Sequence, residues 1–264
     1  MNKFHLVFDI ETGMETPDVL DKFFQYDETA VPGYSLLGQE FDEKSVKLGN
    51  VKNPDLIAEK IEKAREKFLE DQKAAELAAK NGEQIARAQL ENKAPLNAIH
   101  GRVLAVGMYY TQWKNPMSIC HIDMFSGGEK EMLETVLTIF ESVMKNYGHI
   151  IGHNIMNFDL PFLCRRAFKY GIPIPAILTT QMTTWSPTGI IDTMRVWGCG
   201  DRREMVKLDD LAKFFGTTTK NGDGAMFHRL YHGTPKERNE ALEYLKNDVT
   251  MTVEIAEKLG VYQR

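Results

Sequence analysis

The sequence has few cysteines, and they are far apart. Cys120, Cys164 and Cys199 include no Cys-x-x-Cys motif, so neither a disulfide framework nor a cysteine zinc site is expected, and a reducing cytoplasm fits this composition. Long apolar runs are also missing, because no stretch approaches the roughly 18 residues of a membrane-spanning helix. A strand is expected to begin almost at the N-terminus, so no signal peptide is expected.

Positive charge is not in excess either. The chain carries 32 Lys and Arg against 37 Asp and Glu, a formal charge of −5, which argues against broad, charge-driven binding of nucleic acid. A narrow site in which metal ions provide the positive charge is not excluded. With 264 residues, the chain is long enough for one large α/β domain or two small ones.

Two carboxylates interrupt an apolar run near the N-terminus, Leu6–Gly13. A short run rich in Val, Ile and Phe that ends at glycine predicts a buried strand. Because strand side chains alternate between faces, Asp9 and Glu11 are expected to project from the same face. Neighbouring carboxylates repel each other unless a cation lies between them, and divalent cations with oxygen ligands are the usual solution. Taken alone, the pair more often marks a strand end that reaches water.

Residues 14–98 are predicted to form an insertion after this strand. Residues 14–53 mix aromatic and acidic side chains and predict largely irregular structure. A helix is predicted to begin at Asn53, which is a good N-cap and is followed by proline. This charged helix is expected to reach about Gly82, and a second helix is expected over Glu83–Leu90.

Beyond the insertion, predicted strands and helices follow one another. Two segments, 172–189 and 217–226, predict loops because they are rich in Pro, Thr or Gly. The order of elements predicts one α/β domain over residues 1–264, with a mixed β-sheet flanked by α-helices and a helical insertion after the first strand. The predicted strands are 102–111, 117–125, 149–154 and 190–194, and the predicted helices follow Gly128 or span 160–170, 208–215 and 235–259.

A second acidic residue, Asp159, follows the predicted strand 149–154. Leu-Pro comes directly after it, so Asp159 alone is most simply a helix N-cap. Asn154 is equally compatible with a turn, and Phe158 with the core.

The third group lies in the closing helix. A spacing of four places Tyr244 and Asp248 on one face, a turn apart. Leu245 and Val249 are expected to pack inward, which would bring the Tyr/Asp face to the edge of the sheet. Taken alone, the pair is most simply a surface Asp beside a half-buried Tyr.

As an ordered set, the three groups resemble the motifs of a known enzyme family. Asp-x-Glu at 9–11, Asn-x-x-x-Phe-Asp at 154–159 and Tyr-x-x-x-Asp at 244–248 resemble those of the DEDDy branch of DnaQ-like 3′–5′ exonucleases, within the ribonuclease H-like superfamily. The resemblance extends to stand-alone proteins similar to the proofreading domain of family-B DNA polymerases. The sister DEDDh branch carries His five positions before the last Asp, where this chain has Glu243.

The resemblance implies a ribonuclease H-like fold and a metal-dependent 3′–5′ exonuclease that releases 5′-mononucleotides from DNA 3′ ends with two Mg²⁺ or Mn²⁺ ions. Asp9, Glu11 and Asp248 would hold the metal that activates water, and Asp9 would bridge to a second metal that Asp159 helps to hold. Tyr244 would orient the attacking water, since its ordinary pKa near ~10 makes it a poor free base.

The resemblance also implies residues that contact the substrate, a single-stranded or recessed 3′ end. Thr12 and the Thr12–Gly13 backbone would meet the terminal nucleotide, Asn154 would hydrogen-bond near it, and Phe158 would stack on a base.

Several alternatives stay open at this stage. The same acids serve ribonuclease D-like enzymes that act on RNA, and the fold also suits an inactive nucleic-acid-binding or scaffold domain. A partner polymerase or repair complex is possible. Asp192 is a possible fifth acid, although backbone bonding is favoured. His228 and His232 have metal-pair spacing but are favoured as surface histidines. Lys220 lies in a loop that contacts either substrate or only solvent.

Overall fold

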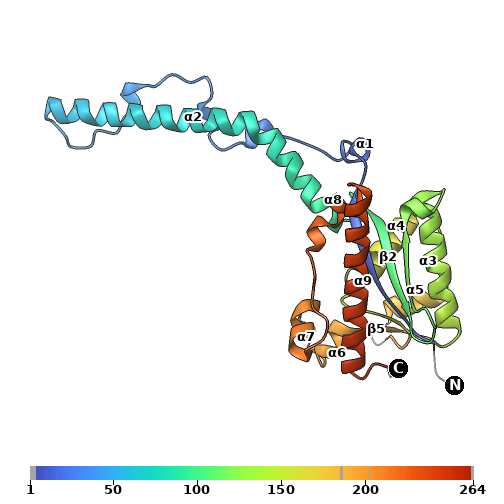
Figure 1. Ribbon diagram of the computed structural model, residues 1–264. Coiled ribbons are helices and arrows are strands. Elements are labelled where there is room, and N and C mark those ends of the chain that lie inside the picture. The colour runs from blue at the N-terminus through green and yellow to red at the C-terminus, as the bar shows by residue number, and fades with distance from the viewer. Residues whose placement is uncertain (1–3, 185–186, 202, 263–264) are drawn as a thin grey trace. The chain divides into compact units, whose positions relative to one another are not determined.

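The computed structural model describes residues 4–184, 187–201 and 203–262 (Figure 1). The chain divides into two compact units. The sheet unit comprises Met1–Thr16 and Ala94–Arg264, and the insertion unit comprises Pro17–Lys93. The insertion unit lies within the insertion that the sequence predicts at 14–98.

The described part of the sheet unit contains a mixed five-stranded sheet in the order β3-β2-β1-β4-β5. The first strand is central and pairs antiparallel with β2 and parallel with β4, while β3 and β5 form the edges. This arrangement confirms the predicted α/β class. The strands are β1 Leu6–Met14, β2 Gly101–Tyr110, β3 Met117–His121, β4 Ile150–Gly152 and β5 Ile190–Asp192.

Helices cover both faces of this sheet (Figure 1). On one face, Phe8 of β1 packs against Phe140 of α3 (Gly128–Lys145), with ring centroids 4.7 Å apart. On the opposite face lies α9 (Pro235–Lys258), a single closing helix with a capping box at Thr234. Because side chains alternate along β1, Asp9 points toward the α9 face while Phe8 enters the core beneath α3.

The remaining helices of the sheet unit differ in part from expectation. Asp192 ends β5 and caps the next helix by accepting from Met194 N–H, so the predicted strand 190–194 stops early. The predicted strand 117–125 likewise ends at His121, and a 3₁₀ turn follows. The other helices are α4 Asp159–Lys169, α5 Ala176–Thr183, α6 Thr193–Trp197, α7 Leu208–Phe215 and α8 Phe227–Tyr231, of which α5 and α8 lie in or beside segments predicted as loops.

The insertion unit is built on α2, a helix of 40 residues from Pro54 to Lys93, preceded by the short helix α1 (Pro17–Leu20) and three 3₁₀ turns. The predicted break at Gly82 is wrong. A Cβ at Gly82 would collide with the Tyr26 hydroxyl, so the glycine makes room for a tyrosine inside a continuous helix.

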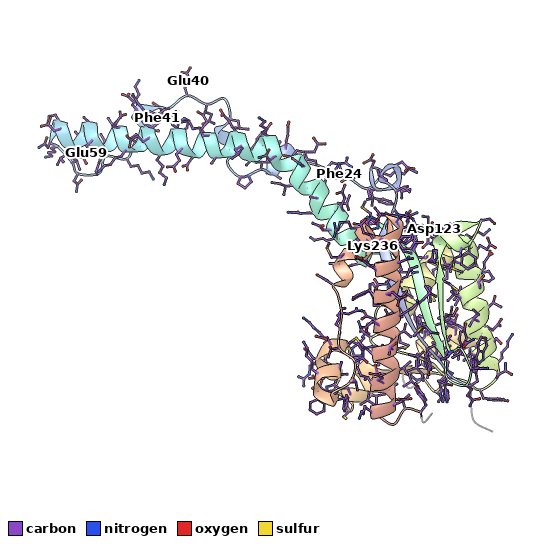
Figure 2. All side chains as sticks on the ribbon, viewed as in Figure 1. Phe24, Glu40, Phe41, Glu59, Asp123 and Lys236 are labelled. Atoms are coloured by element: carbon purple, nitrogen blue, oxygen red, sulfur yellow. The ribbon has the colours of Figure 1, made fainter. Side chains whose placement is uncertain are left out.

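The segment before α2 lies along this helix through aromatic and polar contacts. The Phe41 and Phe68 ring centroids are 5.7 Å apart, and the Arg87 guanidinium lies 4.5 Å from the Phe24 ring centroid. Figure 2 labels Phe24 and Phe41 beside α2. Leu20 and Ala75 are the buried hydrophobic residues among those described in this unit.

Among the described helices of the whole chain, none combines the length and apolar character that crossing a membrane would require.

Candidate metal centre

The first and third sequence motifs meet on the α9 face of the sheet. Asp9 and Glu11 project from β1, and Asp248 projects from α9, which crosses that face. One carboxylate oxygen from each of the three residues lies within 4.8 Å of the others. Within the described residues, this is the group of His, Cys, Asp and Glu side chains that can hold a metal ion.

The second motif approaches the same strand from α4. Asp159 is the first residue of α4 and is 3% exposed. Its Oδ1 accepts a hydrogen bond from the Ile10 N–H at 3.2 Å, between the two acidic positions of β1. The fold therefore brings the acids of all three motifs into one region, which no single motif could have established.

Burial and mutual repulsion dominate the electrostatics of this region. Burial raises the pKa of Asp9 most, followed by the negative charges of Asp159, Glu11 and Asp248. Burial also raises the pKa of Asp159 to about 7. Lys220 opposes these effects at Asp9. Carboxylates crowded in this way ionise together only when a cation neutralises them.

The chemistry of the donors fits a hard divalent cation. Asp248 is 6% exposed, and its Oδ1 is buried without a hydrogen-bond partner among the described residues. A buried carboxylate oxygen without a partner is costly, and binding a cation removes that cost. Oxygen-only ligand sets are the ones that Mg²⁺ and Mn²⁺ prefer.

Tyr244 lies one turn before Asp248 and is buried, with 7% of its surface exposed. Burial first, then the charges of Asp248 and Glu11, raises its pKa above the ordinary value, so its hydroxyl stays protonated at neutral pH. The loop 217–226 lies against the ring, because a Cβ at Gly222 would be only 2.8 Å from Tyr244 Cδ2. Tyr244 can therefore donate a hydrogen bond but cannot act as a free base.

Lys220 is the residue whose importance the sequence pattern did not establish. Its Nζ lies 3.5 Å from Asp248 Oδ2 and 5.0 Å from the Tyr244 ring centroid. The signal was a lone lysine in a glycine-rich loop before the last motif, which fits a solvent-exposed loop equally well. In the structure, its ammonium group offsets part of the negative charge of the acidic cluster.

The predicted substrate residues near the end of β1 are tightly packed. Thr12 is 8% exposed, and its hydroxyl donates to the Pro95 carbonyl at 2.6 Å. A Cβ at Gly13 would collide with His228 and Leu104. The Thr12 hydroxyl therefore already has a hydrogen-bond partner within the fold. Contact between the substrate and the Thr12–Gly13 backbone stays a prediction.

The other two predicted substrate residues lie in the turn before α4. Asn154 has a φ of 60°, which fits the turn conformation that Asn tolerates, and its Oδ1 accepts from Asn157 Nδ2 at 2.9 Å. Phe158 is partly buried, with its ring centroid 5.6 Å from that of Phe162.

The remaining candidate acid, Asp192, is bonded to backbone as the sequence favoured. Its Oδ1 accepts from the N–H groups of Asn154 and Met194, and its Oδ2 accepts from that of Met156, at 2.9–3.0 Å. Both oxygens are occupied, so Asp192 shapes the turn that leads to Asp159.

The histidine pair on α8 and at its end has no third metal ligand among the described residues. The rings of His228 and His232 have centroids 4.7 Å apart. His228 is partly buried rather than a surface residue, and burial lowers its pKa to about 4.

Comparison with solved structures supports the architecture. A family B DNA polymerase from the hyperthermophilic archaeon Pyrobaculum calidifontis matches 64% of this chain with a TM-score of 0.50 and 17% sequence identity. This level of identity shows similarity of fold alone, and the chain spans 23% of the polymerase chain. No curated protein gives a match.

Comparison with protein families is more specific. Residues 96–255 match a family described as predicted 3′–5′ exonucleases related to the exonuclease domain of PolB. The match includes Asp159, Tyr244 and Asp248, while Asp9 and Glu11 lie before it and are added by the fold. Because the match covers more than half of the chain, the protein belongs to this family of predicted 3′–5′ exonucleases related to the exonuclease domain of PolB.

Proposed function

We propose that the protein is a metal-dependent exonuclease that removes 5′-mononucleotides stepwise from DNA 3′ ends, using two Mg²⁺ or Mn²⁺ ions. The observation that carries the proposal is the meeting of Asp9, Glu11 and Asp248 within 4.8 Å, with Asp159 beside the same strand. We treat residues 1–264 as one functional exonuclease domain that includes the insertion.

The four acids form two overlapping sets of ligands, one for each cation. Asp9, Glu11 and Asp248 would hold one ion, and Asp9 together with Asp159 would hold the second. Bound divalent cations supply a hydroxide nucleophile at neutral pH and neutralise charge on the leaving oxygen. In the reaction, water adds to the terminal phosphorus, the bond to the 3′-oxygen of the preceding nucleotide breaks, and that oxygen takes up a proton.

Tyr244 and Lys220 act around these acids. Tyr244 is protonated and a turn from Asp248, so its hydroxyl is suited to orient the attacking water by a hydrogen bond. Lys220 Nζ, 3.5 Å from Asp248 Oδ2, offsets the negative charge of the cluster. Tyr244 therefore positions the water and Lys220 balances charge, and neither residue forms a covalent bond with the substrate.

The substrate contacts are proposed on the same basis. The Thr12–Gly13 backbone meets the terminal nucleotide, Asn154 hydrogen-bonds near it, and Phe158 stacks on a base. Asn154 and Phe158 flank the turn that ends at Asp159, so contacts there would hold the scissile phosphate near the acids.

The test is digestion of a 5′-labelled oligonucleotide with Mg²⁺ or Mn²⁺. We expect a ladder shortened from the 3′ end, no products from Asp9→Ala, and slower turnover from Tyr244→Phe with metal binding retained. Asp210→Asn removes an exposed acid elsewhere and serves as the matched control. A folded wild-type protein that leaves both single-stranded and 3′-recessed DNA intact would refute the proposal, and an RNA strand of the same sequence separates the ribonuclease alternative.

A further inference from the structure

A cavity of about 550 Å³ lies beside the edge strand β5. Its lining is mixed, with apolar side chains, among them Met156, Ile191, Met194 and Met205, beside polar and charged ones. The volume falls within the range of roughly 300–1,000 Å³ that small-molecule sites occupy. We call it the β5 cavity.

The β5 cavity is continuous with the turn that leads to the acidic cluster. Met156 and Asn157 line the cavity and belong to the segment between Asn154 and Asp159. Asn157 Nδ2 donates to Asn154 Oδ1 at 2.9 Å. One wall of the cavity is therefore hydrogen-bonded to a residue that the proposed function places against the substrate.

The same wall carries a guanidinium group. Arg195 also lines the cavity, is exposed, and donates from Nη2 to Asn157 Oδ1 at 3.3 Å. Within the described residues, Arg195 forms no ion pair with a carboxylate, so its other N–H groups are available to a ligand. An arginine fixed at one nitrogen and open at the others is suited to a phosphodiester group.

The lining also holds three acids, and two of them already have partners. Asp192 uses both carboxylate oxygens for backbone N–H groups, and Asp201 pairs with Arg203 at 3.1 Å. Glu204 is the third acid of the lining, and among the described residues no Lys, Arg or His side chain forms an ion pair with it.

We propose that the β5 cavity is a nucleotide subsite for the strand whose 3′ end lies at the acidic cluster. The apolar walls, Met156 and Met205 among them, take an unpaired base, and Arg195 takes the adjoining phosphate. The contacts to the base are apolar, so the subsite tolerates different bases. This inference rests on the proposed function, because it assumes that the cluster receives a nucleic-acid end.

The first test measures binding without catalysis. Fluorescence anisotropy with a labelled single-stranded DNA oligonucleotide in EDTA compares wild type with Arg195→Ala and Met205→Glu, both at exposed side chains. We expect each variant to weaken binding by about fivefold or more, the scale of one base contact. Arg165→Ala and Phe214→Glu, exposed residues outside the cavity, are the matched controls and should bind as wild type.

The second test locates the base. Oligonucleotides that carry one abasic site at successive positions from the 3′ end are digested by wild type and by Met205→Glu. We expect one internal position at which losing the base raises KM in wild type but not in the variant, with kcat little changed. Digestion that is indifferent to every abasic position and to Arg195→Ala would overturn the subsite while leaving the exonuclease intact. Absence of both binding and digestion in wild type would refute both proposals.

Discussion

Gly107 allows α9 to lie close enough to the sheet for its acid to reach β1. Gly107 is opposite Asp9 in the β1–β2 pair, on the face that α9 covers. A Cβ there would lie 2.7 Å from Val249 Cγ2 and 3.0 Å from Leu245 Cγ. Both side chains are fully buried, so neither can turn into solvent, and α9 itself must shift. Asp248 shifts with the helix.

The substitution Gly107→Ala should therefore affect activity more than folding. Adding a methyl group to a packed interface costs about 1–3 kcal/mol of the free energy of unfolding. A displacement of catalytic groups approaching 1 Å costs on the order of 100-fold in rate, so we expect kcat to fall by roughly 10- to 100-fold. The comparison is the initial rate on labelled single-stranded DNA at saturating Mn²⁺, with urea denaturation to confirm that the variant is folded.

Gly189→Ala is the matched control. There a Cβ would lie 3.0 Å from Cε at the flexible end of Met144 and at ordinary contact distances of 3.5 and 3.6 Å from Gln181, so kcat should be unchanged. If Gly107→Ala keeps the wild-type kcat and the wild-type metal-induced rise in melting temperature, the close approach of α9 does not position Asp248, and the reasoning fails.

Three further perturbations probe the charges. Mn²⁺ at about 100 times its Kd should stabilise wild type by about 2.7 kcal/mol, seen as a rise in melting temperature that Asp248→Asn largely removes. Arg166→Met leaves Glu129 buried without its cation and Glu15 with Lys169 alone, and it should lower the free energy of unfolding by roughly 3–5 kcal/mol in urea. In EDTA, stability should fall as pH rises from about 4 to 7, because burial raises the pKa of Asp159 to about 7 and the folded state alone keeps that proton. Asp159→Asn should reduce the slope of this melting profile, and the part of the slope that comes from the raised pKa of Asp9 should remain.

Local periodicity explains what the sequence predicted well. Alternation along β1 placed Asp9 and Glu11 on one face of the strand, and a spacing of four placed Tyr244 and Asp248 on one side of α9. The local patterns did not show that the two pairs lie close together in space. The packing of α9 on the sheet brings them together. The metal-ligand and substrate roles of these residues stay predictions until tested.

Tertiary packing explains what the sequence did not predict. The Thr-rich α5 has poor helix propensity, but Leu178 is fully buried, and the Thr180 hydroxyl donates back to the Ala176 carbonyl at 2.9 Å. The contact of Lys220 with Asp248 joins residues 28 positions apart through a loop without periodicity. Neither the helix α5 nor the contact of Lys220 with Asp248 can be predicted from a local sequence pattern.

A buried arginine explains how a large insertion can follow the strand that carries two of the acids. The chain leaves the sheet unit just after Glu15 and returns to it before Ala98. Both residues, which we call the stems of the insertion, contact Arg166. The Arg166 guanidinium also binds Glu129 through two nitrogens at 2.9 and 2.7 Å. Its donors are therefore matched by acceptors, which is the condition under which buried charge is tolerated.

Arg166 also links the stems to the acidic cluster, because it lies on the helix that carries Asp159. Arg166 lies on α4, two turns after Asp159, and is fully buried. The helix that presents Asp159 to β1 is thus fixed to both ends of the insertion by charge-assisted hydrogen bonds. We therefore expect that changes in the length or sequence of the insertion between Glu15 and Ala98 leave Asp9 and Glu11 in place, because these contacts hold both ends of the insertion to α4.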